Sequence, residues 1–384
     1  MKNVLLLPIF RFGNKMNSIT IRTIETYSRI NKKDYNFIIN VDIATYASID
    51  NYYYNKIKDM DKSYSYLGKN AFKLLKGIIT TTENAKKSDY IIAESEYFYS
   101  VLYSYLIHVL SRKPMTVIIN HVNVDMFKKK SLTHYVVYKY IFNKVKNFLI
   151  SNDDNIISTF KNNFNIGKVG LFKINDGGCD TKLFYSLDIK TYDMIFIGNI
   201  IDRKNAFIIP DILQKLIKYN SSIKLLIITH FGEIDKLRNT LFEKKLNNNV
   251  EFVFYISEEL KKEYLARSKM MIFPSKYEGF GTVVAEGLAS CLPVVIFDVP
   301  TLRTFNKGVL KARPFDINEF VEKIIYLLKN EEIRKSMGLE GKHDMEERFD
   351  YTIVSEIENR AINESIKYSD LLQQNLEHFS SILI

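Results

Sequence analysis

Short apolar runs and stretches with helical spacing alternate along this chain. The runs are mostly apolar, which is typical of strands that are buried on both faces of a parallel sheet. They are Val4–Leu7, Phe37–Val41, Tyr90–Ala93, Val117–Asn120, Phe148–Ile150, Val169–Phe172, Met194–Ile197, Lys224–Ile228, Val250–Tyr255, Met270–Phe273, Val294–Phe297 and Leu310–Ala312. Between them, apolar positions recur every three or four residues and predict helices over 19–30, 207–216, 258–266 and 318–329.

The order of these elements predicts an α/β fold with two domains. Six of the apolar runs precede a polar break at Phe184–Tyr192 and six follow it. Strands that alternate with helices form parallel sheets through right-handed βαβ units. A chain of 384 residues is also longer than one core of ordinary size. We therefore expect two Rossmann-like domains, over 1–184 and 185–365, with parallel sheets that face a central cleft.

The chain is basic, with a formal net charge of +10 and a pI near 9.1. This charge indicates an anionic partner: nucleic acid, a sugar nucleotide or an anionic membrane surface. The sequence has no basic tract with interleaved aromatic residues and no known nucleic-acid motif, so we expect no nucleic acid partner. Its two cysteines, Cys179 and Cys291, match no metal-binding or redox spacing, which indicates a reducing compartment, the cytoplasm.

No segment of the sequence is predicted to cross a membrane. The first residues, MKNVLLLPIFRFG, contain only a brief apolar run with no cleavage site after it, so they are interpreted as a buried strand. Tyr97–Leu110 is apolar but too short to span a bilayer, and a buried helix is the favoured interpretation. Peripheral association with an anionic membrane stays open, because the basic segments Lys128–Lys130 and Lys139–Lys146 are nearby.

Candidate chemistry is concentrated in Phe273–Val295, which reads FPSKYEGFGTVVAEGLASCLPVV. Glu278 and Glu286 lie on either side of a predicted loop–helix junction. Gly279 and Gly281 allow the backbone between them to approach a ligand closely. The unpaired N–H groups at the start of the helix suit a phosphate. Glu286 falls on the second helical turn, where its carboxylate could accept two hydrogen bonds from a vicinal diol such as a ribose.

This segment resembles the donor-binding signature of the retaining family 4 glycosyltransferases. The signature reads Pro-Ser-x-x-Glu-Gly-Phe-Gly, followed by Glu-Ala-x-Ala-x-Gly-x-Pro-Val-Val. The chain departs from it at Gly287, where Ala is usual, and at Cys291, where Gly is usual; we expect the turn at Cys291 to be one that a side chain tolerates. An ordinary strand–loop–helix–strand unit is the alternative. The matching positions are Pro274, Ser275, Glu278, Gly279, Phe280, Gly281, Glu286, Ala289, Pro293, Val294 and Val295.

Three further segments follow the order of landmarks in that family. Asp176–Phe184 (DGGCDTKLF) resembles the turn that opens its second domain, and Met194–Asn205 (MIFIGNIIDRKN) resembles the strand and phosphate loop after it. Arg348–Tyr351 (RFDY) resembles the stretch before the final helices. The resemblance implies the GT-B fold, in which these helices cross back onto the first domain, so we expect 366–384 to pack there.

The resemblance also implies an activity. It implies a retaining glycosyltransferase that moves a sugar from a nucleotide-sugar donor to a glycan, lipid-linked or protein acceptor. The implied mechanism is front-face, so the leaving phosphate helps to deprotonate the acceptor hydroxyl. No cofactor and no obligatory metal are expected.

By the same resemblance, individual residues acquire roles. Lys204 aligns with the phosphate-contacting lysine, while Asn199 stands where an arginine is usual, so Arg203 is expected to supply the missing charge. Glu278 is assigned to the sugar and Glu286 to the ribose. The remaining positions predicted to contact the donor are Gly13, Asn14, Gly198, Gly279, Phe280, Gly281 and Thr282, the last three of them through backbone N–H groups.

Two other positions could take part in catalysis. His121 ends a predicted strand, where open α/β sheets present ligand contacts and where the family often has a histidine near the reacting sugar. A structural histidine is the alternative. Asp59-Met60-Asp61 matches the metal motif of the other major glycosyltransferase fold, but it lies in a lysine-rich stretch and is predicted to be a solvated loop or helix.

Three alternatives to a transferase remain. A pair of carboxylates could serve a glycoside hydrolase, but such pairs usually come from separate strands, whereas Glu278 and Glu286 share one loop–helix unit. A glycosyltransferase-like subunit that binds without turnover is favoured by Asn199 and Cys291. Another GT-B enzyme, such as a sugar-nucleotide epimerase, is the third alternative.

Overall fold

The structure is a computed structural model and describes residues 1–7, 18–42, 51–65, 71–120, 132–164 and 169–382. The chain forms two compact units. The first unit comprises Met1–Asp176 and Thr352–Ile384, and the second comprises Gly177–Tyr351. Both divisions fall earlier in the chain than the expected boundaries after residues 184 and 365.

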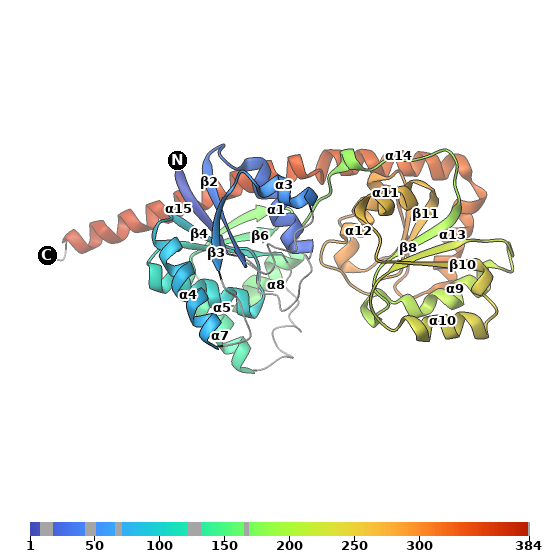
Figure 1. Cartoon of the computed structure of the whole chain (residues 1–384), viewed down its shortest axis with the longest axis horizontal. Coiled ribbons are helices and arrows are strands. Elements are labelled where there is room, and N and C mark those ends of the chain that lie inside the picture. Colours follow the sequence, from blue (N-terminus) through green and yellow to red (C-terminus); the bar gives the residue numbers. More distant parts are fainter. Residues whose placement is uncertain (8–17, 43–50, 66–70, 121–131, 165–168, 383–384) are drawn as a thin grey trace. The chain divides into compact units, whose positions relative to one another are not determined.

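The first unit contains a seven-stranded parallel sheet (Figure 1). Its strand order is β3-β2-β1-β4-β5-β6-β7, so β1 lies between β2 and β4. Four of its strands, β1, β4, β5 and β6, are mostly apolar and are buried along most of their length, because helices cover both faces of the sheet. The strands are β1 (Lys2–Leu7), β2 (Tyr35–Asp42), β3 (Asp61–Ser65), β4 (Tyr90–Ala93), β5 (Met115–Ile119), β6 (Asn147–Ser151) and β7 (Gly170–Ile174).

The expectation of six strands in this sheet was wrong, because β3 was missed. β3 reads DKSYS and pairs only with β2, so it lies at the edge of the sheet. An edge strand needs no apolar run, since one of its sides is unpaired. The interpretation of 59–61 as a solvated loop or helix was also wrong in part. Asp59 is an exposed turn residue, but Met60 is buried and Asp61 begins β3, where its carboxylate accepts a hydrogen bond from Asn36 (2.8 Å).

Helices flank this sheet on both sides. They include the predicted helix over 19–30, which is α1, and the apolar segment at 97–110, which forms most of α5. The helices of the first unit are α1 (Ser18–Ile30), α3 (Asn51–Ile57), α4 (Ala71–Lys86), α5 (Phe98–Ser111), α7 (Leu132–Lys144), α8 (Asp154–Phe164) and α15 (Tyr351–Ile382).

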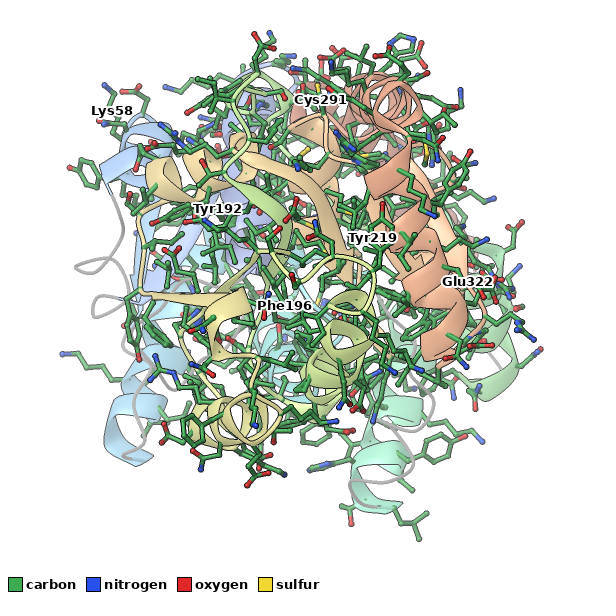
Figure 2. All side chains as sticks on the ribbon, turned by 90° about the vertical axis from the view of Figure 1, so that its right-hand side faces the viewer. Lys58, Tyr192, Phe196, Tyr219, Cys291 and Glu322 are labelled. Atoms are coloured by element: carbon green, nitrogen blue, oxygen red, sulfur yellow. The ribbon has the colours of Figure 1, made fainter. Side chains whose placement is uncertain are left out.

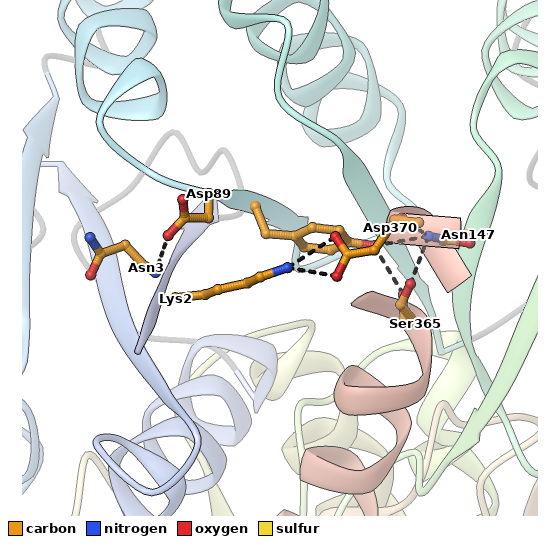
Figure 3. A network of polar contacts seen from close by, with 8 residues as sticks. Lys2, Asn3, Asp89, Asn147, Ser365 and Asp370 are labelled. Atoms are coloured by element: carbon orange, nitrogen blue, oxygen red, sulfur yellow. Dashed lines mark hydrogen bonds and ion pairs between the residues drawn. The ribbon is translucent and has the colours of Figure 1, made fainter. Parts of the chain in front are cut away.

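The final helix, α15, packs against the first unit through polar contacts (Figure 3). Lys2 Nζ forms an ion pair with Asp370 (2.7 Å), and the side-chain amide of Asn147 donates to the Ser365 carbonyl (3.1 Å). A buried ion pair joins Arg22 of α1 to Glu358 of α15, and Glu358 also accepts a hydrogen bond from the Tyr27 hydroxyl (2.7 Å). The last helix of the first unit, α15, is thus held to its first helix, α1, by a buried ion pair.

The second unit contains a six-stranded parallel sheet. All six strands predicted for this part of the chain are present, in the order β10-β9-β8-β11-β12-β13. Figure 2 labels Tyr192 and Phe196, at the start and near the end of β8, whose side chains are buried. The strands are β8 (Tyr192–Ile197), β9 (Leu225–Thr229), β10 (Val250–Phe254), β11 (Ser268–Phe273), β12 (Val294–Phe297) and β13 (Val309–Ala312). Two parallel sheets with alternating helices confirm the predicted fold class.

The helices of the second unit bury their apolar faces on this sheet. Phe273, Phe297 and Phe320 are fully buried between the layers. The α-helices are α9 (Ile209–Leu216), α10 (Ile234–Glu243), α11 (Glu258–Ala266), α12 (Thr282–Ala289), α13 (Ile317–Lys329) and α14 (Glu331–Arg348). Short 3-10 helices cover Thr181–Leu183, Asp202–Lys204, Ala206–Ile208, Asn247–Asn249 and Pro300–Leu302.

The topology brings two distant loops together in the second unit. The chain moves outward from β8 through β9 to β10 and then returns to the other side of β8 as β11. The loops that follow β8 and β11 therefore leave adjacent strands at the same edge of the sheet. Ligands of open α/β sheets bind outside the carboxyl ends of the strands at such a switch point.

No helix in the described part of the chain combines the length and the apolar character that a membrane crossing requires.

Candidate functional site

The loops after β8 and β11 are fastened to each other in the second unit. The backbone N–H of Lys276 donates to the Arg203 carbonyl (2.9 Å). The side chain of Lys276 forms an ion pair with Asp202 (2.5 Å). These contacts hold 198–205 against 274–281, so residues more than seventy positions apart form one edge of the sheet.

Glu278 is the centre of a charged cluster that these loops create. One carboxylate oxygen, Oε2, accepts from Arg203 Nη1 (2.6 Å), and the other, Oε1, accepts from Lys204 Nζ (2.8 Å). The backbone N–H of Glu278 donates to the Thr301 hydroxyl (3.0 Å), which fixes the start of the loop. The structure thus brings together Arg203, Lys204 and Glu278.

The cluster holds two cations and one carboxylate. Lys204 is almost fully buried, and burial lowers the pKa of its ammonium group, while the carboxylate of Glu278 opposes that shift. Its Nζ also lies 4.7 Å from the centre of the Phe273 ring. The Arg203 side chain is 32% exposed, so it can also reach a ligand. The excess of positive charge at a partly exposed edge suits an anion such as a diphosphate.

Gly198 and Asn199 begin the loop after β8. A Cβ at Gly198 would lie 3.3 Å from Phe196 Cζ and 3.5 Å from Lys204 Cδ, so the lysine stem passes next to this glycine at ordinary contact distance. The backbone N–H of Ile200 donates to the Phe231 carbonyl (2.8 Å), which fastens this loop to the one after β9. Asn199, at the position where the family has arginine, adds no charge.

The second carboxylate, Glu286, projects from the second turn of α12. Its Oε1 accepts from Lys261 Nζ (2.8 Å), and Lys261 also pairs with Glu258 (2.7 Å). Burial raises the pKa of Glu286, and the charge of Lys261 opposes that rise. Burial alone would lower the pKa of Lys261, but Glu286 and Glu258 outweigh it, and the pKa of Lys261 is raised. Lys261 therefore opposes protonation of the buried carboxylate.

Lys261 was missed by reasoning from the sequence. It lies on α11, three residues after Glu258, and this spacing is equally typical of an exposed ion pair on a helix surface. Only the packing of α11 against the segment that follows β11 reveals its contact with Glu286. Thr301 was missed for a similar reason, since nothing marks it apart from other loop threonines.

Some of the buried polar atoms without a partner lie at this edge, while others, such as Thr26 Oγ1 and Thr82 Oγ1, lie in the first unit. In the second unit, all of whose residues are described, the atoms without a partner are Asn199 Oδ1, Ser275 Oγ and Glu286 Oε2. All three belong to the segments that follow β8 and β11. Buried polar atoms in proteins nearly always have hydrogen-bond partners, so such a group of exceptions indicates a place where a polar ligand supplies them.

The glycine-flanked loop ends at the start of α12. Gly281 has φ +92°, a conformation that favours glycine, and it precedes the first helical residue, Thr282. The Phe280 side chain does not face a ligand, because it is buried against the rings of Phe305 and Phe349 (5.2 Å between centroids in each case). Phe280 and its neighbours Gly279, Gly281 and Thr282 thus remain candidates through their backbone N–H groups.

The two departures from the signature have structural reasons. A Cβ at Gly287 would lie 2.8 Å from Met271 Cε, so the methionine of β11 fills the space that an alanine methyl would need. Cys291 has φ +57°, which lies in the left-handed region that side chains adopt only uncommonly. The turn keeps the left-handed conformation, and α14 packs on it so closely that a Cβ at Gly338 would lie 2.1 Å from the Cys291 carbonyl oxygen.

Three predicted site residues, Gly13, Asn14 and His121, lie outside the described residues. Within the described part of the chain, no three His, Cys, Asp or Glu side chains are grouped so as to hold a metal ion.

One known protein family matches most of the second unit. Residues 184–344 match the family described as glycosyl transferases group 1. The second unit belongs to this family. The match covers the loops after β8 and β11, α11 and α12, and hence the whole charged edge described above.

Two curated relatives of this glycosyl transferases group 1 domain align over part of the chain. An uncharacterized glycosyltransferase of Methanocaldococcus jannaschii is 27% identical over 151 residues, which are 38% of this chain and 41% of the relative. The poly(ribitol-phosphate) alpha-N-acetylglucosaminyltransferase of Staphylococcus aureus is 24% identical over 157 residues, 40% of this chain and 31% of the relative. The aligned segments thus span less than half of either relative.

In its fold, nearly the whole chain resembles a solved structure. The crystal structure of Anabaena HepE in complex with UDP-glucose superposes with a TM-score of 0.76 at 13% identity, covering 95% of this chain and all of HepE (100%). At this identity the likeness shows the fold alone, which is the GT-B fold.

Proposed function

We propose that this protein is a retaining glycosyltransferase that moves a sugar from a nucleotide-sugar donor to a hydroxyl group of a glycan, lipid-linked or protein acceptor. The observation that carries the proposal is the set of buried, partnerless polar atoms at the edge formed by β8 and β11, above all Glu286 Oε2. The Lys261 ammonium already occupies the other oxygen of that carboxylate, so Oε2 is left for a ligand hydroxyl. A ribose hydroxyl suits it, because a charged acceptor makes strong hydrogen bonds with neutral donors.

We propose that the cationic cluster binds the diphosphate of the donor. Arg203 and Lys204 carry more positive charge than Glu278 neutralises, and α12 begins beside them with unpaired N–H groups. Charge grows on the leaving diphosphate as the bond to the sugar breaks, so fixed cations there lower the barrier. We propose that this arrangement needs no divalent metal and no other cofactor.

The transfer itself is a substitution at the anomeric carbon of the sugar. The bond from this carbon to the diphosphate oxygen breaks, and its electrons leave with the diphosphate. A new bond forms from the acceptor oxygen on the same face of the sugar, and the acceptor proton passes to the leaving phosphate. We propose that Glu278 accepts a hydrogen bond from a sugar hydroxyl while it holds Arg203 and Lys204 in position.

The relatives support a sugar nucleotide as donor. HepE was crystallised with UDP-glucose, and the matched Staphylococcus aureus enzyme is named for transfer of N-acetylglucosamine. These names make UDP-glucose and UDP-N-acetylglucosamine the first donors to test. We also propose the cytoplasm as the compartment, because Cys179 and Cys291 are both free thiols.

A panel of sugar nucleotides tested by thermal shift, followed by a hydrolysis and transfer assay, tests the proposal. A true donor raises the melting temperature by mass action, and it should be hydrolysed slowly or transferred in the presence of excess EDTA. Binding with neither transfer nor hydrolysis for any donor would instead support a non-catalytic binding subunit. Conversion of the sugar without release from the nucleotide would support an epimerase.

A further inference from the structure

The outer surface of three neighbouring helices in the first unit is unusually apolar. Helix α5 contacts both α4 and α7, and Figure 1 shows the three helices next to one another at one side of the first sheet. We call the exposed surface of these helices the α4–α5–α7 face.

Helix α5 is apolar on its outer side as well as on its buried side. Val101, Tyr103 and Ile107 are buried in the core, together with Ser100, Ser104 and Ser111. Leu102, Leu106, Val109 and Leu110 are at the opposite positions, and 38% to 51% of each is exposed. A helix against water normally has polar residues on its outer side, so this outer stripe is suited to an apolar environment.

The neighbouring helices extend the stripe sideways. On α4, Leu75 and Ile79 are 56% and 57% exposed. On α7, Val136 and Tyr140 are both 57% exposed. Scattered exposed apolar residues are normal on soluble proteins, but a group that continues over three adjacent helices marks an interaction surface.

The charged residues on this face have nearly one sign. Helix α5 contains no Asp, Glu, Lys or Arg, while α4 and α7 together contain five lysines and one glutamate. Lys139 and Lys144 of α7 are exposed, as are Lys86 at the end of α4 and Arg112 after α5. Long basic side chains can keep their charge at a polar surface while their stems cover apolar groups.

We propose that the α4–α5–α7 face docks the protein on an anionic lipid bilayer. Apolar side chains on the outer side of α5 enter the boundary between headgroups and acyl chains, and the lysines contact anionic headgroups. A bilayer explains both features, because it offers a broad apolar layer under a uniformly negative surface. A protein partner would need acidic residues in matching positions, and a second copy of this chain would bring lysines against lysines.

This docking does not depend on the proposed transferase activity, because it involves the first unit and needs no donor. If the transferase proposal also holds, docking would favour a lipid-linked acceptor over a soluble one. Failure of either proposal leaves the other standing.

Vesicle flotation of the full chain tests the docking. The protein should float with vesicles of phosphatidylcholine and phosphatidylglycerol, and it should bind vesicles of phosphatidylcholine alone much more weakly. The double variant Leu106→Gln, Leu110→Gln should bind the anionic vesicles at least about tenfold more weakly, because two leucine side chains no longer enter the bilayer. The double variant Lys139→Glu, Lys144→Glu should also weaken binding by about tenfold or more.

Matched substitutions on the second unit supply the controls. Phe242→Gln removes a side chain that is 72% exposed, and Lys215→Glu with Lys218→Glu reverses two exposed charges. Both controls should bind like the wild-type protein. Equal binding to both kinds of vesicle, or binding unaffected by the α5 and α7 variants, would overturn the proposal. So would a wild-type protein that fails to float but forms a dimer, seen by sedimentation velocity, that the Leu106→Gln, Leu110→Gln variant loses.

Discussion

Each unit contains a group of charged side chains drawn from distant parts of the chain, but the two groups differ in charge balance and exposure. In the second unit, Arg203 and Lys204 share Glu278, so cations are in excess, and the Arg203 side chain is 32% exposed. In the first unit, Arg22 lies among carboxylates, and its side chain and that of Glu358 are only 4% and 0% exposed.

The difference separates a binding group from a structural one. An exposed excess of positive charge can take a further anion, which is the requirement of a diphosphate site. A fully buried group with excess carboxylate cannot do so, and it relieves its charge by protonation instead. Glu94 shows this, because burial raises its pKa to about 8, against the opposing effects of the Thr23 hydrogen bond and of Arg22. The following substitutions test this contrast.

The largest effect is expected from Glu358→Ala in the first unit. It leaves Arg22 buried without this carboxylate and removes the acceptor of the Tyr27 hydroxyl. Breaking a buried ion pair from one side should lower the free energy of unfolding by about 3–5 kcal/mol. Urea denaturation measures this, with the exposed Glu364→Ala on the same helix as control. A loss no greater than that of the control would show that this group does not hold α15 in place.

Substitutions in the charged cluster of the second unit should instead lower the rate of sugar transfer. In the proposed mechanism Lys204→Ala removes a cation that faces the leaving diphosphate, so the rate of transfer should fall about 10²–10³-fold. Arg203→Ala should be about as severe if Arg203 replaces the charge that is missing at Asn199. Asn199→Arg in the Arg203→Ala background should then restore part of the rate.

Steady-state kinetics of these variants decides how the charge is shared. If only Lys204→Ala reduces the rate, Arg203 is a surface residue that takes no part in transfer. The site then works with less positive charge than a site with arginine at the position of Asn199. Lys215→Ala, an exposed lysine elsewhere in the second unit, is the control and should leave the rate unchanged.

The two groups also differ in what the sequence revealed. Lys204, Glu278 and Glu286 follow apolar strand patterns and glycines, so their meeting at one edge could be predicted from parallel topology. The group around Arg22 and Glu358 joins residues that are 336 positions apart, and no local pattern relates α1 to α15. Lys261 and β3 escaped prediction for the related reason that their neighbours in space, rather than in sequence, determine their roles.

A smaller effect is expected on the pH dependence of stability. The pKa of Glu94 is about 8 in the folded protein and about 4.5 when exposed, so the folded state binds the extra proton between these values. Stability should therefore fall as pH rises through this range, by at most about 1.4 kcal/mol per pH unit. Glu94→Gln should flatten that slope, which urea denaturation at several pH values measures. An unchanged slope would mean that Glu94 is not the group responsible.

Of these variants, Lys261→Met should have the smallest effect at neutral pH, where nucleotide binding should change little. In acid it should weaken nucleotide binding more. Burial raises the pKa of Glu286, and without Lys261 it should rise further. Nucleotide binding that needs the charged carboxylate should then be lost at a higher pH than in the wild-type protein as the solution is acidified. Calorimetry over a pH series measures this, and an acid limb at the wild-type position would mean that Lys261 does not keep Glu286 charged.

Calorimetric titration of Glu286→Ala with the nucleoside diphosphate that best stabilises the wild-type protein tests the central claim most directly. If Glu286 Oε2 holds the ribose, the variant should lose about 1.5–3 kcal/mol of binding free energy, the worth of hydrogen bonds to a charged group. Glu286→Gln, which keeps the shape but not the charge, should lose less. Wild-type affinity in a folded Glu286→Ala protein would contradict the account.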